Sequence, residues 1–297
     1  MSDPLATSGI VVVDKPQGLT SHDVVARLRR AFGTRKVGHA GTLDPMATGV
    51  LVVGIERGTK LLARLVAETK TYEATIRLGA ATTTDDAEGD IVSTAPTSAV
   101  TDANISDAVD AFQGEIMQRP SSVSAIKIDG KRAHQLVREG HDVELPARPV
   151  TIHEYDILGI TRVDEWIDID VRVHCSSGTY IRALARDLGE ALQTGGHLTA
   201  LRRTTVGPFN LDHAMELEDI QSNPRLSLTL DEACATCWPV LPVTDEEYDA
   251  LAMGKWLEPR GLKGVHAAQR ADGHVVALVK ESKKRLATVF VARPSTL

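Results

Sequence analysis

Apolar and polar positions in the first third of the chain follow two periods. Residues 9–16, "GIVVVDKP", form a short apolar run that stops at a proline, which predicts a strand. Residues 20–33 begin with a candidate N-cap threonine, carry an acid three residues later and close on glycine, so they are predicted to be a helix. Apolar runs at 50–56 and 71–79 predict two more strands, separated by a helical segment at 59–67.

Longer predicted strands dominate the middle of the chain. A polar loop at 79–90 and a predicted helix at 105–114 precede a strand-like stretch at 148–160. Residues 165–176 alternate Ile and Val with polar residues, which indicates one buried and one wet face, and helical period returns at 179–192. Because these elements do not follow a regular strand-helix-strand repeat, we predict an α+β domain around a mixed, mainly antiparallel sheet.

The segment after Trp238 differs from what precedes it. Its start contains two prolines, and a short helix is predicted at 244–254. Apolar stretches beyond this helix predict strands joined by an Asp-Gly turn. We therefore predict two domains, a large one at 1–237 and a small β-rich one at 238–297. The small domain has a length close to the lower limit for independent folding.

Composition places the chain among ordinary globular proteins. It has 297 residues, of which 42% are hydrophobic and 25% charged, so a chain that is disordered throughout is excluded. No apolar run approaches the roughly 18 to 20 residues that cross a bilayer. The first residues also lack a basic segment followed by an apolar one. We expect a cytoplasmic protein without membrane association.

Charge is distributed unevenly along the chain. The net charge of −7 does not favour a nucleic-acid partner. However, acids are in excess at 65–115, 151–215 and 216–245, whereas Lys and Arg are in excess at 1–64, 116–150 and 246–297. A fold that gathered the basic segments would present a positive face to a polyanion. From charge alone, solvated surfaces remain the simpler interpretation.

The cysteines do not indicate a metal or redox site. Cys175, Cys234 and Cys237 cannot all pair within one chain. The last two form a single C-x-x-C with neither a second pair nor nearby histidines, a pattern more typical of structural thiols. We predict no metal site and, because cofactor motifs are absent from the sequence, no cofactor.

The stretch "GHAGTLDPMATG", residues 38–49, holds one acid, Asp44. The proline after it favours an extended backbone, and the glycines allow another chain to approach closely. The stretch is not a phosphate loop, because no Gly-Lys-Ser/Thr follows the glycines, and it lacks metal-ligand spacing. On local grounds alone, Asp44 is more simply a turn or capping acid.

Five ordered blocks carry a more specific signal. They are "DKPQGLTSHDVV", "VGHAGTLDPMATGVLVVGI", "KTYEATIRLG", "SAIKIDGKRAHQL" and "CSSGTYIRALARDLG". Together, from about Gly9 to Gly207, they closely resemble the bacterial TruB family, the tRNA pseudouridine-55 synthases. The tail after Trp238 is similar, more loosely, to the small RNA-binding PUA-like domain that ends these enzymes. The resemblance implies a pseudouridine synthase fold and cofactor-free isomerisation of uridine to pseudouridine at position 55 in the T loop of tRNA.

The resemblance also implies three catalytic residues. Asp44 corresponds to the family's catalytic aspartate. The reaction breaks the bond between N1 of uracil and C1′ of its ribose, and a carboxylate can stabilise the positive charge at C1′ or bond to it. Arg182 matches the arginine that pairs with this aspartate, and Tyr72 matches the tyrosine that stacks on the target base and assists removal of the C5 proton. From the residues alone, Arg182 would be a helix-surface arginine and Tyr72 a half-buried strand aromatic.

Further residues match the family's substrate contacts. The target base is stacked inside a folded tRNA, so the enzyme must flip it out. His39 matches a histidine placed against the disrupted loop, and Tyr180 and Leu201 match residues lining the uridine pocket. Lys15 and Pro16 are expected to support the active-site loop.

Basic residues are candidates for phosphate contacts, which set affinity rather than base choice. They are Lys127, Lys131, Arg132, Arg202 and Arg203. A solvated surface stays an open alternative for them. An insertion at about 126–150, which includes strand-like residues, corresponds to the family's mobile segment that closes over RNA. The expected partner is tRNA, through its T arm and, for the C-terminal domain, its acceptor stem, and the chain is expected to be a monomer.

Three functions compete at this point. The first is a stand-alone tRNA uridine isomerase. The second is an RNA-binding or tRNA-folding protein with a relic catalytic loop, which the intact Asp44, Tyr72 and Arg182 argue against. The third is a guide-RNA-dependent relative acting on other RNAs, which the complete bacterial-type insertion disfavours.

Overall fold

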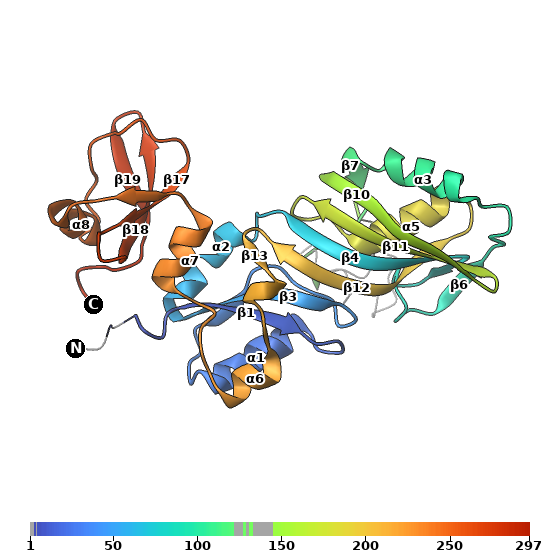
Figure 1. The fold of residues 1–297 in the computed structure, drawn as a ribbon, viewed down its shortest axis with the longest axis horizontal. Helices are drawn as coiled ribbons and strands as arrows, with labels where there is room; N and C mark the ends of the chain where they lie inside the picture. The colour runs from blue at the N-terminus through green and yellow to red at the C-terminus, as the bar shows by residue number, and fades with distance from the viewer. Residues whose placement is uncertain (1–2, 4, 122–126, 129–130, 133–144) are drawn as a thin grey trace. The chain divides into compact units, whose positions relative to one another are not determined.

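Two compact units make up the chain in the computed structural model (Figure 1). The structure describes residues 3, 5–121, 127–128, 131–132 and 145–297. Unit 1 comprises Met1–Pro45, Gly49–Val66 and Gly207–Leu297, and unit 2 comprises Met46–Thr48 and Ala67–Val206. Among the helices that the structure describes, none is both long and apolar enough to span a bilayer.

The core of unit 1 is a pair of buried strands. β1 (Gly9–Lys15) runs antiparallel to β3 (Thr48–Ile55), which also pairs with β2 (Val37–His39). Both long strands are almost continuously apolar and buried, as expected for strands covered on both faces. Two short strands, β14 (Met215–Glu216) and β15 (Leu228–Thr229), pair with β1.

The helices of unit 1 confirm one prediction and correct another. α1 (Ser21–Ala31) begins after Thr20 in a capping box with Asp23, as predicted. The segment predicted as helical at 59–67 is instead a 3-10 helix, η1 (Glu56–Lys60), and a single α-helical turn, α2 (Leu62–Leu65). Neither η1 nor α2 has a side-chain cap at its N-terminus, so no capping side chain stabilises the first turn of the longer helix that was predicted there.

Two further helices of unit 1 follow in the chain. α6 (Leu217–Ser222) packs on α1, and α7 (Leu230–Cys237) packs on β1. Like α1, α7 begins after a threonine, Thr229, in a capping box.

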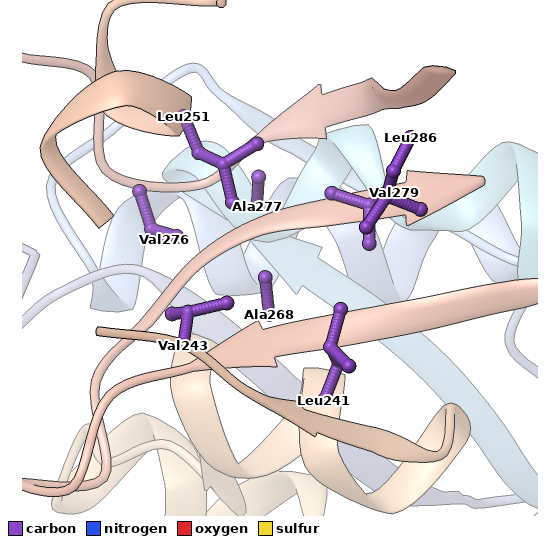
Figure 2. Close-up of a cluster of buried hydrophobic side chains, with 8 residues drawn as sticks. All are labelled: Leu241, Val243, Leu251, Ala268, Val276, Ala277, Val279 and Leu286. Atoms are coloured by element: carbon purple, nitrogen blue, oxygen red, sulfur yellow. The ribbon is translucent and has the colours of Figure 1, made fainter. Parts of the chain in front are cut away.

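A separate four-stranded sheet occupies the end of the chain. Its order is β16 (Val240–Pro242), β17 (Val265–Gln269), β18 (Val275–Ser282) and β19 (Arg285–Val291). Asp272 and Gly273 lie in the turn between β17 and β18, as predicted, and α8 (Asp245–Ala252) packs on the sheet. Figure 2 shows its core of Leu241, Val243, Leu251, Ala268, Val276, Ala277, Val279 and Leu286. The domain boundary at 237/238 stays a prediction.

Arginines of unit 1 hold the C-terminal sheet by its edge strand. Arg57 Nε donates to Ala292 O at 2.9 Å, and Arg57 Nη2 donates to Val291 O at 2.5 Å. Arg64 Nη2 donates to Val289 O at 3.3 Å. These donors satisfy carbonyl groups that an edge strand would otherwise expose.

Unit 2 is built on five antiparallel strands. Their order is β12 (Gly196–Val206), β4 (Lys70–Leu78), β11 (Trp166–Cys175), β10 (Arg148–Val163) and β7 (Gly114–Gln118). α5 (Ile181–Ala191) packs on β12 and β4, and α3 (Asp102–Ala111) packs on β10. Two small hairpins, β5 (Ala80–Thr82) with β6 (Ile91–Thr94) and β8 (Lys127–Ile128) with β9 (Lys131–Arg132), complete the unit. The predicted α+β class with a mainly antiparallel sheet is confirmed.

β12 is a strand that the sequence pattern did not predict. Its alternation is broken because Arg203, a charged residue, points to the buried face. Register shifts near Thr199 and Thr204 also change which residues face inward. A period-2 search therefore misses this segment.

Candidate active site

Lys15 ties the start of the chain to the loop of Asp44 in unit 1. Its ammonium is fully buried and donates to Pro16 O at 2.9 Å, Leu19 O at 2.7 Å and Pro45 O at 3.4 Å. The N–H of Gly18 also donates to Pro45 O at 2.8 Å. The residue after Asp44 is thus held by two donors, an arrangement in keeping with the supporting role predicted for Lys15 and Pro16.

His39 lies at the end of β2, five residues before Asp44. Its ring is half-buried and stands edge-on to the ring of His22, with centroids 5.6 Å apart. His22 braces the ring from α1, which favours a fixed orientation.

Three predicted residues of unit 2 share the buried face of its sheet. Tyr72 lies opposite Arg203 on the neighbouring strand, and Leu201 lies opposite Ala74, two residues further along β4. Tyr72 is 8% exposed and Arg203 is 1% exposed. The half-buried alternative for Tyr72 is therefore wrong, and the burial of Arg203 argues against a surface phosphate contact. Arg202 lies opposite Glu73 and points to the other, wetter face.

Lys70 belongs to this buried face, although sequence reasoning did not select it. It precedes Tyr72 by two residues on β4, is 6% exposed, and donates through Nζ to Glu68 O at 2.7 Å. Burial, and then the charge of Arg203, lower the pKa of Lys70 to about 8. Cys175 lies opposite it on β11, and burial raises the pKa of this thiol to about 11. The strand alternation in "KTYEA" was the signal available for Lys70.

Arg182 occupies the first turn of α5 and is only 4% exposed, so the helix-surface alternative is wrong. Its Nη1 donates to Thr84 O at 2.9 Å, and its Nε lies 3.6 Å from Asp86 Oδ2. Asp86 is itself buried and accepts from Glu88 N at 3.0 Å and Thr84 Oγ1 at 2.5 Å. The polar loop at 79–90 therefore orients the guanidinium, a contribution that the sequence did not reveal.

Tyr180 is the N-cap residue of α5 and is fixed by Gln118. Tyr180 N donates to Gln118 Oε1 at 2.8 Å, and Gln118 Nε2 donates to Tyr180 O at 3.0 Å. Gln118 is buried at the end of β7, 62 residues away in sequence. The N-cap side chain makes no capping bond, and Gln118 satisfies the N–H of the N-cap residue itself, so the start of the helix that carries Arg182 is held from β7.

The remaining basic candidates are described only in part. Lys127 and Arg132 face each other across the β8–β9 hairpin, as do Ile128 and Lys131, but their side chains lie outside the described parts of the chain. Most of the insertion predicted at 126–150 lies outside them too. Arg202 Nη1 donates to Thr48 Oγ1 at 3.3 Å within unit 2.

One group of potential metal ligands occurs among the described residues. Atoms of Asp3, Asp231 and His274 lie within 4.8 Å of one another. However, Arg293 Nη2 lies 2.8 Å from Asp3 Oδ2 and 2.5 Å from Asp231 Oδ2. The guanidinium supplies the positive charge there, and the group is best described as an ion-pair cluster.

Cys234 is a buried free thiol whose pKa is raised by burial.

Asp44 belongs to unit 1, whereas Tyr72 and Arg182 belong to unit 2. The catalytic roles that the resemblance assigns to these residues stay predictions.

Family models cover most of the chain. The model described as "TruB family pseudouridylate synthase (N terminal domain)" matches residues 29–181. A "tRNA pseudouridylate synthase B C-terminal domain" matches 182–233, and "tRNA Pseudouridine synthase II, C terminal" matches 238–293.

Individual relatives match over the full length. Proteins named tRNA pseudouridine synthase B from Corynebacterium efficiens and Mycobacterium sp. strain KMS are 68% and 58% identical over 297 residues, covering 100% of both chains in each case. A chain in the crystal structure of the archaeal box H/ACA sRNP Nop10-Cbf5 complex is 26% identical with a TM-score of 0.70, over 99% of this chain and 89% of that one.

Proposed function

Because the chain belongs to the TruB family of pseudouridylate synthases and is therefore a uridine isomerase, we propose that its substrate is tRNA and its target the uridine at position 55 of the T loop. The observation that carries this proposal is the 68% identity, over the whole chain, to a relative named tRNA pseudouridine synthase B. The geometry supports it, because Arg182 is held by a hydrogen bond and an ion pair, Tyr72 lies on a buried face, and the residue after Asp44 is tethered.

Asp44 acts at ribose C1′ in this proposal. As the bond to N1 breaks, positive charge develops at C1′, and the carboxylate stabilises it or bonds to it. The uracil leaves as an anion and turns, and C5 then bonds to C1′, which releases the carboxylate from C1′ if the two had bonded. C5 loses its proton and N1 gains one, so atoms and charge balance without a cofactor. The tethered backbone at Pro45 supports this role because it limits the freedom of the residue beside it.

Arg182 supplies the positive charge that partners the catalytic aspartate in this proposal, as the resemblance to the family implies. Thr84 and Asp86 fix the guanidinium in one orientation. Burial of the Arg182–Asp86 pair costs free energy of desolvation. A preorganised positive charge for catalysis is a function that would offset this cost in selection.

Tyr72 provides a face for the flipped uracil. The base must leave its stack in the T loop, and stacking on an aromatic ring returns about 1 to 3 kcal/mol per base. Tyr180 and Leu201 complete the pocket on the same unit, and His39 braces the loop from which the base was taken.

Binding of the tRNA body relies on basic groups away from the chemistry. Arg202 and the insertion contact phosphates near the T arm, and the C-terminal sheet contacts the acceptor stem as a PUA-like domain. We propose that a single chain is sufficient, and that the reaction takes place in the cytoplasm. Phosphate contacts of this kind set affinity and make it salt-dependent.

The alternatives predict different requirements. A guide-RNA-dependent enzyme would need an added RNA, and a tRNA-folding protein would bind without making pseudouridine. The names of the 68% and 58% identical relatives favour the tRNA-directed form over the guide-dependent one.

The test is an assay of pseudouridine in RNA treated with the purified protein alone. A T-arm stem-loop and a full-length tRNA should both gain pseudouridine at the T-loop uridine, and a stem-loop with cytidine there should gain none. Conversion only with an added guide RNA, or no conversion of either substrate, would contradict the proposal.

A further inference from the structure

The hydroxyl of Ser21 holds both backbone groups of Leu43, the residue before Asp44. Ser21 Oγ accepts from Leu43 N at 2.8 Å and donates to Leu43 O at 3.1 Å. Ser21 is 1% exposed and Leu43 is buried as well, so both bonds are shielded from water. A hydroxyl is the smallest side-chain group that can donate and accept at once.

These two bonds act on a part of the loop without regular secondary structure. Leu43 lies between the end of β2 at His39 and the start of β3 at Thr48. A buried N–H and C=O outside a helix or sheet need partners, and Ser21 supplies one for each. On the other side of Asp44, Pro45 O is held by Lys15 and Gly18. Asp44 is thus flanked by two tethered residues.

Helix capping does not explain the hydroxyl of Ser21. The N-cap of α1 is the preceding residue, Thr20, whose Oγ1 accepts from Asp23 N at 3.1 Å. Ser21 is the first helical residue, a position where a hydroxyl is not required for the helix. Its hydroxyl is instead directed to Leu43, 22 residues away in sequence.

We propose that Ser21 is a positioning residue for Asp44: it orients the carboxylate by fixing the peptide groups that precede it. The proposal rests on the function proposed above, in which Asp44 acts at C1′. A displacement of about 1 Å at a reacting group can lower a rate by about 10²-fold. Ser21 therefore contributes to the rate of isomerisation and not to RNA affinity.

The experiment compares two neighbouring hydroxyls. Ser21→Ala removes the bonds to Leu43, whereas Thr20→Ala removes the cap of the same helix and leaves those bonds in place. We expect Ser21→Ala to lower the single-turnover rate on a T-arm stem-loop by roughly 10- to 100-fold, with RNA affinity within about three-fold of wild type. Thr20→Ala should lower the melting temperature and leave the rate within about two-fold, when both are assayed well below their melting temperatures.

Ser21→Thr keeps a hydroxyl and serves as the rescue variant, so it should restore most of the lost rate. A rate for Ser21→Ala within about two-fold of wild type would overturn the proposal, as would an equal loss in Thr20→Ala. A loss that Ser21→Thr fails to restore at unchanged melting temperature would overturn it too. Failure of the proposed function is distinguishable, because the wild-type protein would then make no pseudouridine.

Discussion

Tyr72 of β4 and Arg203 of β12 lie directly opposite each other on the buried face of the unit 2 sheet. Side chains opposed in this way in an antiparallel pair have Cβ atoms roughly 5 Å apart. A planar aromatic group therefore lies beside a buried cation, and Lys70 adds a second cation on the same face. If the proposed function holds, such surroundings suit a uracil ring that becomes anionic when its bond to ribose breaks.

Tyr72 variants separate stacking from the hydroxyl. Tyr72→Phe keeps the ring face, whereas Tyr72→Leu removes both the face and the hydroxyl. We expect Tyr72→Leu to reduce the single-turnover rate further than Tyr72→Phe by about 10-fold or more, since one stacked base is worth about 1 to 3 kcal/mol. Equal rates for the two variants would show that stacking on Tyr72 is not used.

Asp44→Asn tests the catalytic carboxylate. The substitution preserves size and removes the charge, so isomerisation should fall by at least about 10³-fold while affinity for the stem-loop stays within a few-fold. Asp23→Asn is the matched control, because Asp23 is an exposed acid of the same unit and takes part in the capping box at the start of α1. Substantial turnover by Asp44→Asn would remove this residue from the mechanism.

Lys70 makes folding stability depend on pH. Burial and Arg203 lower the pKa of Lys70 to about 8, whereas the unfolded chain has the ordinary value of 10.5. Between these values the unfolded chain binds more protons, so the contribution of Lys70 to the free energy of unfolding rises as pH increases from about 8 to about 10.5. Lys70→Met should flatten this rise and stabilise the protein at pH 7 by about 2 to 3 kcal/mol.

Urea unfolding at several pH values measures this effect. Cys175 acts in the opposite direction, because the raised pKa of its thiol lowers stability between about 9 and about 11. The comparison is therefore made between Lys70→Met and wild type, both of which contain Cys175. Parallel pH profiles would show that Lys70 does not titrate in this range.

The turn between β18 and β19 tests RNA binding by the C-terminal sheet. Lys283 and Lys284 of this turn and Arg285, the first residue of β19, are exposed and adjacent. Their combined replacement by Ala should weaken binding of full-length tRNA. The salt dependence of log affinity should also decrease, by roughly one unit for each phosphate that the protein no longer neutralises. Binding of a T-arm stem-loop should not change.

Arg225→Ala is the control for this experiment, because Arg225 is an exposed arginine already paired with Asp219 at 2.5 Å. If the turn variant and wild type have equal affinities and equal slopes of log affinity against log salt concentration, these residues are solvated surface residues and do not bind RNA.

Local sequence patterns predicted the elements whose signals are local. The apolar run of β1, the alternation of β11 and the capping box at Thr20 each occupy a few consecutive residues, and each is present. β12 was missed because Arg203 occupies an inward position and interrupts the alternation.

The supporting contacts of the candidate site could not be predicted in the same way. Ser21 and Leu43 are 22 residues apart, Gln118 and Tyr180 are 62 apart, and no periodicity connects either pair. The polar loop gave no indication that Asp86 would be buried beside Arg182. Resemblance to a family pointed to residues expected to contact the substrate but not to the side chains that hold them in place.

The start of α5 depends on a distant strand, so the two should unfold locally together. α1, α3, α7 and α8 each begin after a threonine in a capping box, so their first turns are stabilised by neighbouring residues. α5 has no such cap and is held by Gln118. In native-state hydrogen exchange, the amide of Tyr180 and those at the end of β7 should therefore become exposed together, as one cooperative unit. The order of the helix turn that carries Arg182 is thus set by the integrity of a strand 62 residues earlier in the chain.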